Sequence, residues 1–329
     1  MQERKLFFSW PKDDKIYKGD IMTFTTVVKD EVTHNDNNSI ELLCELSAYI
    51  RFNSQIQINS IIITVENATV AKRIYKSIKE IFGINIKITV RNQRKLRIKQ
   101  IYILEIHDKI SQILKTLNID ITNIKKLPEE YFLESEEEKI AYLRGMFLAC
   151  GSISDPKISG YHLEFTTKYK KEAAYVIKLL NEFKLTTKVL KRTNNYMAYV
   201  KSAEMISDFL KLLGATNAMF YFEDIRIYRD HKNTVNRLNN CELANQERTI
   251  KTGLRQLEEI NYLKEHDLIE LLDDKIKKVI YYREKYPETS FQELAKIINI
   301  ESGKNIGKSA VNHYFIKIKD IVEKHKKRK

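Results

Sequence analysis

Cysteine and histidine are too few and too scattered in this 329-residue sequence to form a disulfide framework or a metal cluster. The three cysteines, Cys44, Cys150 and Cys241, lie far apart with no Cys-x-x-Cys motif, and the seven histidines are dispersed along the chain. This spacing argues against a small disulfide-rich secreted protein and against a structural zinc site, and it fits a reducing compartment. We therefore expect a cytoplasmic protein with no bound metal and no cofactor.

Long apolar runs are also absent. No stretch approaches the roughly 18 uninterrupted apolar residues of a membrane-spanning helix. The N-terminal segment MQERKLFFSWPKDDKIYKGD has a short apolar patch but neither an h-region nor a small-residue cleavage site, which argues against a secretory signal. We expect no membrane partner.

Glycine and proline are scarce, at 9 and 4 residues, while Lys, Ile and Asn are abundant, a composition typical of AT-rich genomes. The excess of 57 Lys and Arg over 44 Asp and Glu gives a formal charge of +13. Such an excess indicates a polyanionic partner, which is DNA, RNA or anionic lipid. Because genome bias contributes to this total, the distribution of the charge along the chain carries more weight. A hydrophobic fraction of 43% indicates a globular chain with room for two or three domains.

Two parts of the chain read as copies of one unit. LSAYIRFNSQI (46–56) aligns without a gap to LRGMFLACGSI (143–153). In both copies a strand-like run, an amphipathic helix, two β-rich segments and a second helix follow in the same order. This pattern predicts the element order α-ββ-α-ββ-α, twice.

Small residues mark the first helix of each copy. Ala141, Gly145 and Ala149 recur every four residues, after a capping box formed by Ser135 and Glu138. Cys44 and Ala48 stand at the matching positions of the first copy. Small residues at this spacing let two helix backbones approach closely, so we expect the two helices to pack together. The alternative is that each small face lies against a sheet.

Two such units joined through small-residue helices resemble the LAGLIDADG homing endonucleases. In that family each of the two helices ends in an acidic residue, and the two carboxylates hold divalent metal against the scissile phosphates. The corresponding positions here carry Asn53 and Cys150. A neutral amide and a thiol are poor ligands for magnesium. Asp155, before Pro156, is typical of a turn. We therefore expect a scaffold without nuclease activity.

The chain is similar over residues 22–320 to the bacterial WhiA family. Four stretches carry the resemblance: MTFTTVVKDEV, YLRGMFLACGSISDP with YHLEF, NTVNRLNNCELAN, and SFQELAKII followed by GKSAVNH. The resemblance implies a DNA-binding regulator of cell division and chromosome segregation, and of sporulation in some relatives. Residues 1–21 extend ahead of the usual start, and NIESGKNIG is longer than the family's usual turn.

The resemblance also implies an α+β fold, in which a duplicated LAGLIDADG-like αββαββα domain precedes an all-α helix-turn-helix domain. We predict five segments: an N-terminal extension (1–21), a first repeat (22–125), a second repeat (126–232), a helical linker (233–272) and a helix-turn-helix domain with a basic tail (273–329).

The predicted linker contains a helix with one apolar stripe. Asn245 can cap this helix, and the stripe consists of Ile250, Leu254, Leu257, Ile260 and Leu263. The side chains that match the family signature are Asn236, Arg237, Asn240, Cys241, Glu242 and Asn245. They indicate either a ligand or partner site or a hydrogen-bonded junction with the second repeat, and we favour the junction.

Positive charge is concentrated at the C-terminal end. From Lys275 onward there are 15 Lys and Arg against 6 Asp and Glu, which places +9 of the formal +13 in the last sixth of the chain. The pattern predicts three helices, of which the second opens with a capping box at Ser290 and Glu293 and the third begins near Ser309. Val311, Phe315 and Ile318 would face inward on the third helix.

A helix-turn-helix protein reads base edges from the N-terminal part of its second motif helix. We predict that the residues that contact DNA are Ser290, Gln292, Lys308, Ser309, Asn312, His313 and Lys317. Asn312 can match an adenine edge, and Lys308 can reach guanine or phosphate. His313 can donate to phosphate, or it is merely tolerated at the surface. Residues 323–329 would form a mobile basic tail that adds affinity without sequence preference, or a solvated basic tail with no role.

A basic hairpin in the first repeat is a candidate for an auxiliary DNA contact, through Arg91, Arg94, Lys95, Arg97 and Lys99. The alternative is an ordinary charged turn.

The sequence thus predicts a non-enzymatic, sequence-specific DNA-binding protein that acts at the nucleoid. Double-stranded DNA is the expected partner, a regulatory protein is a second candidate partner, and no small-molecule substrate is expected. The alternatives are an active homing endonuclease and a protein-interaction adaptor that does not bind DNA.

Overall fold

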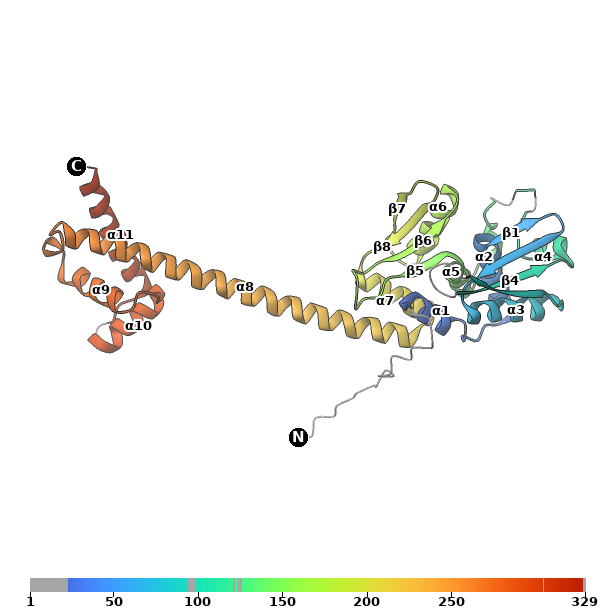
Figure 1. The fold of residues 1–329 in the computed structure, drawn as a ribbon, viewed down its shortest axis with the longest axis horizontal. Coiled ribbons are helices and arrows are strands. Elements are labelled where there is room, and N and C mark those ends of the chain that lie inside the picture. Colours follow the sequence, from blue (N-terminus) through green and yellow to red (C-terminus); the bar gives the residue numbers. More distant parts are fainter. Residues whose placement is uncertain (1–22, 94–98, 121, 124–125, 304, 328–329) are drawn as a thin grey trace, which may run out of the picture. The chain divides into compact units, whose positions relative to one another are not determined.

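The computed structural model describes residues 23–93, 99–120, 122–123, 126–303 and 305–327. The chain divides into two compact units, one up to Tyr228 and the other from Arg229 onward (Figure 1). The first unit contains two mixed α/β repeats and the second is helical, which confirms the predicted α+β class.

The first unit begins with helix α1 (Phe24–Val32), which has no counterpart in the predicted order. The first repeat then comprises α2 (Ser39–Asn53), β1 (Ser54–Gln57), β2 (Ser60–Val65), α3 (Ala68–Phe82), β3 (Lys87–Gln93), β4 (Lys99–Ile106) and α4 (Ile110–Thr116). Its sheet is antiparallel with strand order β1-β2-β4-β3.

The second repeat follows a short 3₁₀ turn, η1 (Glu130–Phe132). It comprises α5 (Glu136–Cys150), β5 (Gly151–Ile153), β6 (Leu163–Thr167), α6 (Lys170–Glu182), β7 (Lys188–Lys191), β8 (Tyr196–Val200) and α7 (Ala203–Leu212). Its strand order, β5-β6-β8-β7, is that of the first sheet, so the predicted α-ββ-α-ββ-α order is confirmed in both copies.

Helices α2 and α5 pack directly on each other, as the small-residue pattern predicts (Figure 1). At Gly145, an added Cβ would lie 2.1 Å from the Glu45 carbonyl oxygen and 2.9 Å from the Ala48 Cβ. The capping box of α5 is also present, since the Ser135 hydroxyl accepts from the Glu138 N–H while the Glu138 carboxylate accepts from the Ser135 N–H. The alternative, that the small face of α5 lies only against a sheet, is wrong.

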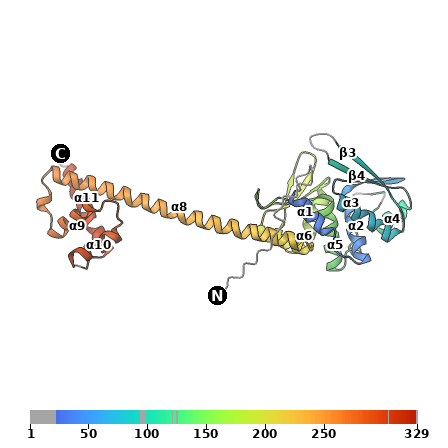
Figure 2. The ribbon, with the colours of Figure 1, turned by 60° about the horizontal axis from the view of Figure 1, so that its bottom comes forward.

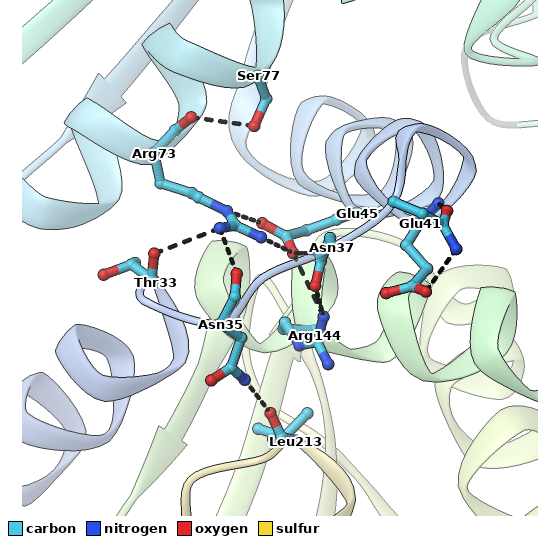
Figure 3. Close-up of polar contacts among 10 residues, drawn as sticks. Thr33, Asn35, Asn37, Glu41, Glu45, Arg73, Ser77, Arg144 and Leu213 are labelled. Atoms are coloured by element: carbon cyan, nitrogen blue, oxygen red, sulfur yellow. Dashed lines mark hydrogen bonds and ion pairs between the residues drawn. The ribbon is translucent and has the colours of Figure 1, made fainter. Parts of the chain in front are cut away.

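A buried ionic network lies at the same helix pair (Figure 3). The Glu45 carboxylate on α2 accepts two hydrogen bonds from Arg73 on α3, at 2.9 and 3.1 Å, and one from Asn37 at 2.8 Å. Arg144 on α5 lies 3.8 Å from the same carboxylate and donates to the Asn37 side-chain oxygen at 2.6 Å. Since Glu45 is 1% exposed, its paired charges hold α2, α3 and α5 in one register.

The second unit consists of most of the long helix α8 with a short 3₁₀ turn and three further helices (Figure 2). These elements are α8 (Thr216–Glu265), η2 (Ile269–Leu271), α9 (Asp274–Lys285), α10 (Phe291–Ser302) and α11 (Lys308–Lys326). Their core contains Ile260 and Leu263 of α8 and the predicted inward residues of α11, Val311, Phe315 and Ile318.

Two details of the predicted C-terminal half are wrong. Asn245 does not begin a helix, because α8 is continuous through it, and only the last part of the predicted stripe is buried; Leu254 is 55% exposed. Residues 323–326 are not a mobile tail but the last turn of α11, where His325 Nδ1 lies 3.0 Å from the Tyr262 hydroxyl and Lys326 stands over the Tyr262 ring. A tertiary contact fixes this turn, and charge alone could not reveal it.

The α2–α5 contact predicts that Gly145→Ala destabilises the first unit. Alanine normally stabilises a helix interior relative to glycine, but here its methyl group would overlap a backbone carbonyl of α2. We expect a loss of about 1–3 kcal/mol of unfolding free energy, measured by urea denaturation. The control is Gly160→Ala, where nothing lies within 4 Å of the added Cβ. Equal stability of the two variants would contradict the close packing.

Candidate nucleic-acid interface

Helices α10 and α11 form a helix-turn-helix with a hydrogen-bonded turn. Helix α10 ends at Gly303, whose φ of 62° lies in the left-handed region. The Asn299 side chain spans the turn, donating to the Ile306 carbonyl at 2.9 Å and accepting from the Ile306 N–H at 2.7 Å. These two hydrogen bonds between Asn299 and Ile306 stabilise the turn, although it is longer than the family's usual turn.

The N-terminal part of α11 presents a polar, positively charged face. The burial of Val311 and Phe315 on one side leaves the other side free, as predicted. The predicted contact residues on this helix are all exposed: Lys308, Ser309, Asn312, His313 and Lys317. This face therefore presents hydrogen-bonding and cationic groups to a ligand.

The other two predicted contact residues lie at the start of α10. Gln292 is exposed. The Ser290 hydroxyl accepts from the Glu293 N–H at 3.3 Å, and the Glu293 carboxylate accepts from the Ser290 N–H at 2.8 Å. The capping box is thus present, and Ser290 has a structural role there whatever else it contacts.

A buried arginine that the sequence analysis did not single out supports this helix pair. Arg283 of α9 is 1% exposed, and its guanidinium carbon lies 5.7 Å and 5.4 Å from the ring centroids of Phe291 and Phe315. Its Nη1 donates to the Thr289 carbonyl at 2.7 Å. Burial lowers the pKa of Arg283 to about 10, so the side chain stays protonated at neutral pH. Arg283 is therefore a permanent positive charge beneath the start of α10.

The two positions that align with the acidic residues of the endonucleases lie at the ends of α2 and α5, as the alignment predicts. The Asn53 side chain donates to the Tyr49 hydroxyl at 2.9 Å and to the Thr64 carbonyl at 3.2 Å. The Cys150 thiol lies 3.4 Å from the Met146 carbonyl, and burial raises its pKa to about 12. Neither group is an anionic oxygen, so the pair lacks the ligands that a hard cation needs. Asp155 accepts from the Lys157 N–H at 2.8 Å, as expected of a turn.

Helix α1 supplies a cation beside these positions. The Lys29 ammonium donates to the Leu148 carbonyl at 3.0 Å and lies 5.6 Å from the centroid of the Phe147 ring. Burial lowers the pKa of Lys29 to about 8, which leaves it mostly protonated at neutral pH. The Thr25 hydroxyl also donates to the Ile153 carbonyl at 2.8 Å, which fixes α1 against β5. A lysine therefore stands beside Cys150, where a nuclease of this fold would need a metal.

The basic hairpin is described only in part. Arg91 on β3 is exposed and pairs in register with Ile101 on β4. Lys99 is the first residue of β4. The remaining predicted contacts, Arg94, Lys95 and Arg97, lie outside the described residues.

Within the described part of the chain, no group of three or more His, Cys, Asp or Glu side chains is placed to hold a metal ion. A search of the same residues finds no helix with the length and apolar character needed to cross a membrane.

The environment of Cys150 predicts slow alkylation of this thiol in the folded protein. Its raised pKa leaves almost no thiolate at pH 8, whereas Cys241 is exposed and serves as the internal control. We expect iodoacetamide to label Cys241 at least about tenfold faster than Cys150, as measured by mass spectrometry of timed digests. Similar rates in the native state, with no unfolding, would contradict the raised pKa of the Cys150 thiol.

Comparison with known proteins identifies the family. Three family models match: the WhiA N-terminal LAGLIDADG-like domain over residues 40–120, the WhiA LAGLIDADG-like domain over residues 139–232 and the WhiA C-terminal HTH domain over residues 235–322. The probable cell division proteins WhiA of Bacillus cereus and Bacillus anthracis are each 39% identical over 310 residues, which covers 92% of this chain and 97% of theirs. The crystal structure of full-length DUF199/WhiA from Thermatoga maritima, 22% identical, has the same fold, with a TM-score of 0.54 over 92% of this chain and 99% of that one. The chain belongs to the WhiA family.

Proposed function

We propose that this protein binds DNA in a sequence-specific manner as a transcriptional regulator that acts in cell division and chromosome segregation. The observation that carries the proposal is the exposed polar face at the start of α11, within a region that matches the WhiA helix-turn-helix model. The names of the relatives, probable cell division protein WhiA, support the cellular role. Binding to chromosomal DNA would place the protein at the nucleoid.

Asn312 is the residue that we assign to base recognition. It is exposed in the second turn of α11, and its amide can donate to and accept from an adenine edge at the same time. We assign the neighbouring exposed residues of the same helix to contacts with phosphate or with neighbouring bases: Lys308, Ser309, His313 and Lys317. We assign the start of α10, with Ser290 and Gln292, to contacts with the DNA backbone, since the first helix of the motif crosses the backbone.

We further propose that the protein has no nuclease activity. Hydrolysis by the LAGLIDADG-like scaffold would require two carboxylates that hold divalent metal. Asn53 and Cys150 stand at those positions, with the Lys29 ammonium beside Cys150. Incubation with supercoiled plasmid and magnesium should therefore leave the plasmid intact, and cleavage would instead establish the homing endonuclease alternative.

A regulatory protein partner is the second part of the proposal. Residues 229–248 of α8 are exposed almost throughout, and among them Leu238 and Leu243 are 61% and 57% exposed. Exposed apolar side chains on a helix offer a surface that a protein partner can cover. The signature residues lie in this part of α8 and are all exposed, which supports a partner site in place of the hydrogen-bonded junction that the sequence favoured: Asn236, Arg237, Asn240, Cys241, Glu242 and Asn245.

The assignment of Asn312 predicts a loss of specificity without a loss of general affinity. Asn312→Ala should weaken binding to the cognate site by about 1–3 kcal/mol and leave binding to unrelated DNA near normal. The site would first be located by crosslinking the protein to chromosomal DNA, and affinities would then be measured at fixed salt. Asn239→Ala, which removes an exposed asparagine from α8, is the matched control. A uniform weakening on all sequences would overturn the assignment.

A different outcome is expected when the last three residues, 327–329, are removed. These residues carry positive charge only, so their loss should weaken binding to every sequence and make the affinity less dependent on salt. Helix α11 ends at Lys326, which leaves its contact with Tyr262 in place. If this truncation and Asn312→Ala have the same effect, the separation between base reading and electrostatic binding is wrong.

A further inference from the structure

A small cavity lies beside the start of α10 and α11 and reaches helix α8. Its volume is about 210 Å³, which is large enough for a phosphate group. Four parts of the second unit line it: α8, α9, the α9–α10 connection with the start of α10, and the first residue of α11. The lining residues are Arg248, Thr249, Thr252, Arg283, Thr289, Ser290, Phe291 and Lys308.

The side chains that line this cavity are positively charged or neutral, and none is negatively charged. The lining contains three cationic side chains, four hydroxyl groups and a phenyl ring, but no carboxylate. Arg248 and Lys308 are exposed, so their charged ends are free to meet a ligand at the rim. Because like charges disfavour one another in a shared cavity, such a lining is stabilised when an anion enters it.

Arg283 gives a second reason to expect an anion in this cavity. Its side chain is buried and protonated, yet it forms no ion pair with any carboxylate among the described residues. The Nη1 atom makes its hydrogen bonds to neutral groups of the α9–α10 connection, at Tyr286, Pro287 and Thr289. The Nε atom is buried without any hydrogen-bond partner. A buried cation without a counter-charge is costly, and an anion in the adjoining cavity would compensate it.

Donors other than the cations are also available at the cavity. The Ser290 hydroxyl oxygen accepts from the backbone of α10, which leaves its own proton free for a ligand. Helix α11 has Gly307 at its N-cap and therefore no side-chain cap, so the N–H groups of its first turn lack a side-chain acceptor. By contrast, the Thr249 and Thr252 hydroxyls donate to carbonyls of α8 itself and form only a polar wall.

Gly253 lets α8 pack close enough to the α9–α10 connection for its side chains to line the cavity. At Gly253, an added Cβ would lie 2.0 Å from the Pro287 carbonyl oxygen. The absence of a side chain thus lets α8 pack against the backbone of the α9–α10 connection. Arg248, Thr249 and Thr252 reach the cavity as a result of this approach.

We propose that this cavity is an oxyanion site that takes a phosphoryl group, and that in the DNA complex the group is a phosphodiester of the DNA backbone. Arg248 from α8 and Lys308 from the start of α11 bind its oxygens, Ser290 donates from the start of α10, and Arg283 of α9 supplies a fixed positive charge. The assignment of the phosphoryl group to DNA, and not to another phosphate compound, rests on the proposed function. The site makes α8 a part of the DNA interface, next to the two helices of the motif.

The test compares Arg248→Gln with Arg255→Gln in the full-length protein. Arg255 also lies exposed on α8 but does not line the cavity, so its substitution removes the same charge elsewhere. Affinity for DNA of unrelated sequence would be measured over a range of salt concentrations. We expect Arg248→Gln to weaken binding about tenfold at low salt and to reduce the slope of log affinity against log salt by about 1. Arg255→Gln should change the slope by much less.

A second measurement separates a DNA phosphate from a free one. Inorganic phosphate would be added in place of chloride at equal ionic strength, and the melting temperature recorded for the wild type and for Arg248→Gln. Stabilisation of the wild type alone supports the oxyanion site whether or not DNA is the source. Stabilisation together with an unchanged DNA salt slope would assign the site to a free phosphate compound and overturn the DNA assignment.

Failure of the site and failure of the proposed function give different results. If the wild type binds no DNA at all, the proposed function fails, and the phosphate measurement still tests the cavity. If DNA binding is normal in Arg248→Gln and phosphate stabilises neither protein, the oxyanion site is wrong while the role of Asn312 is unaffected.

Discussion

The close approach of helices α2 and α5 is the constraint on which the rest of the first unit depends. Gly145 removes the side chain that would otherwise separate the two backbones, and Ala48 faces it from the partner helix. Once the helices are this close, Glu45 lies within reach of Arg144 as well as Arg73, and the charges are paired inside the protein. Asn53 and Cys150 are the last residues of these two packed helices, at the positions that align with each other in the two repeats.

The parts of this structure that follow from local rules could be predicted from the sequence. The two capping boxes, at Ser135 and Ser290, depend only on residues three positions apart. The duplication and the inward face of α11 follow from periodicity. The wrong start at Asn245 has the same origin, because a good capping residue in the middle of a sequence looks like a helix start even when the helix continues through it.

Features that depend on distant parts of the chain could not be predicted in this way. Lys29 and Leu148 are 119 positions apart, and no local pattern places an ammonium group there. The Arg283 side chain is one of many basic residues in the C-terminal region, and only the positions of Phe291 and Phe315 show that it is buried. His325 in the supposed tail becomes ordered through Tyr262, which lies 63 positions earlier. The candidate residues on α11 were found because their exposure follows from the burial of their neighbours on the same helix.

The lysine that α1 places beside Cys150 bears on how this scaffold could change over evolution. Two substitutions, at the ends of α2 and α5, would restore the acidic pair of an endonuclease. Such a pair would meet an ammonium group already hydrogen-bonded to the end of α5, and it would form ion pairs with that group in place of binding magnesium. A metal site here would therefore also require the substitution or displacement of Lys29, which α1 holds in place through the hydrogen bond of Thr25 to β5. The identity of the residues at these two positions is therefore only part of what a metal site here would need, because α1 holds a cation beside them.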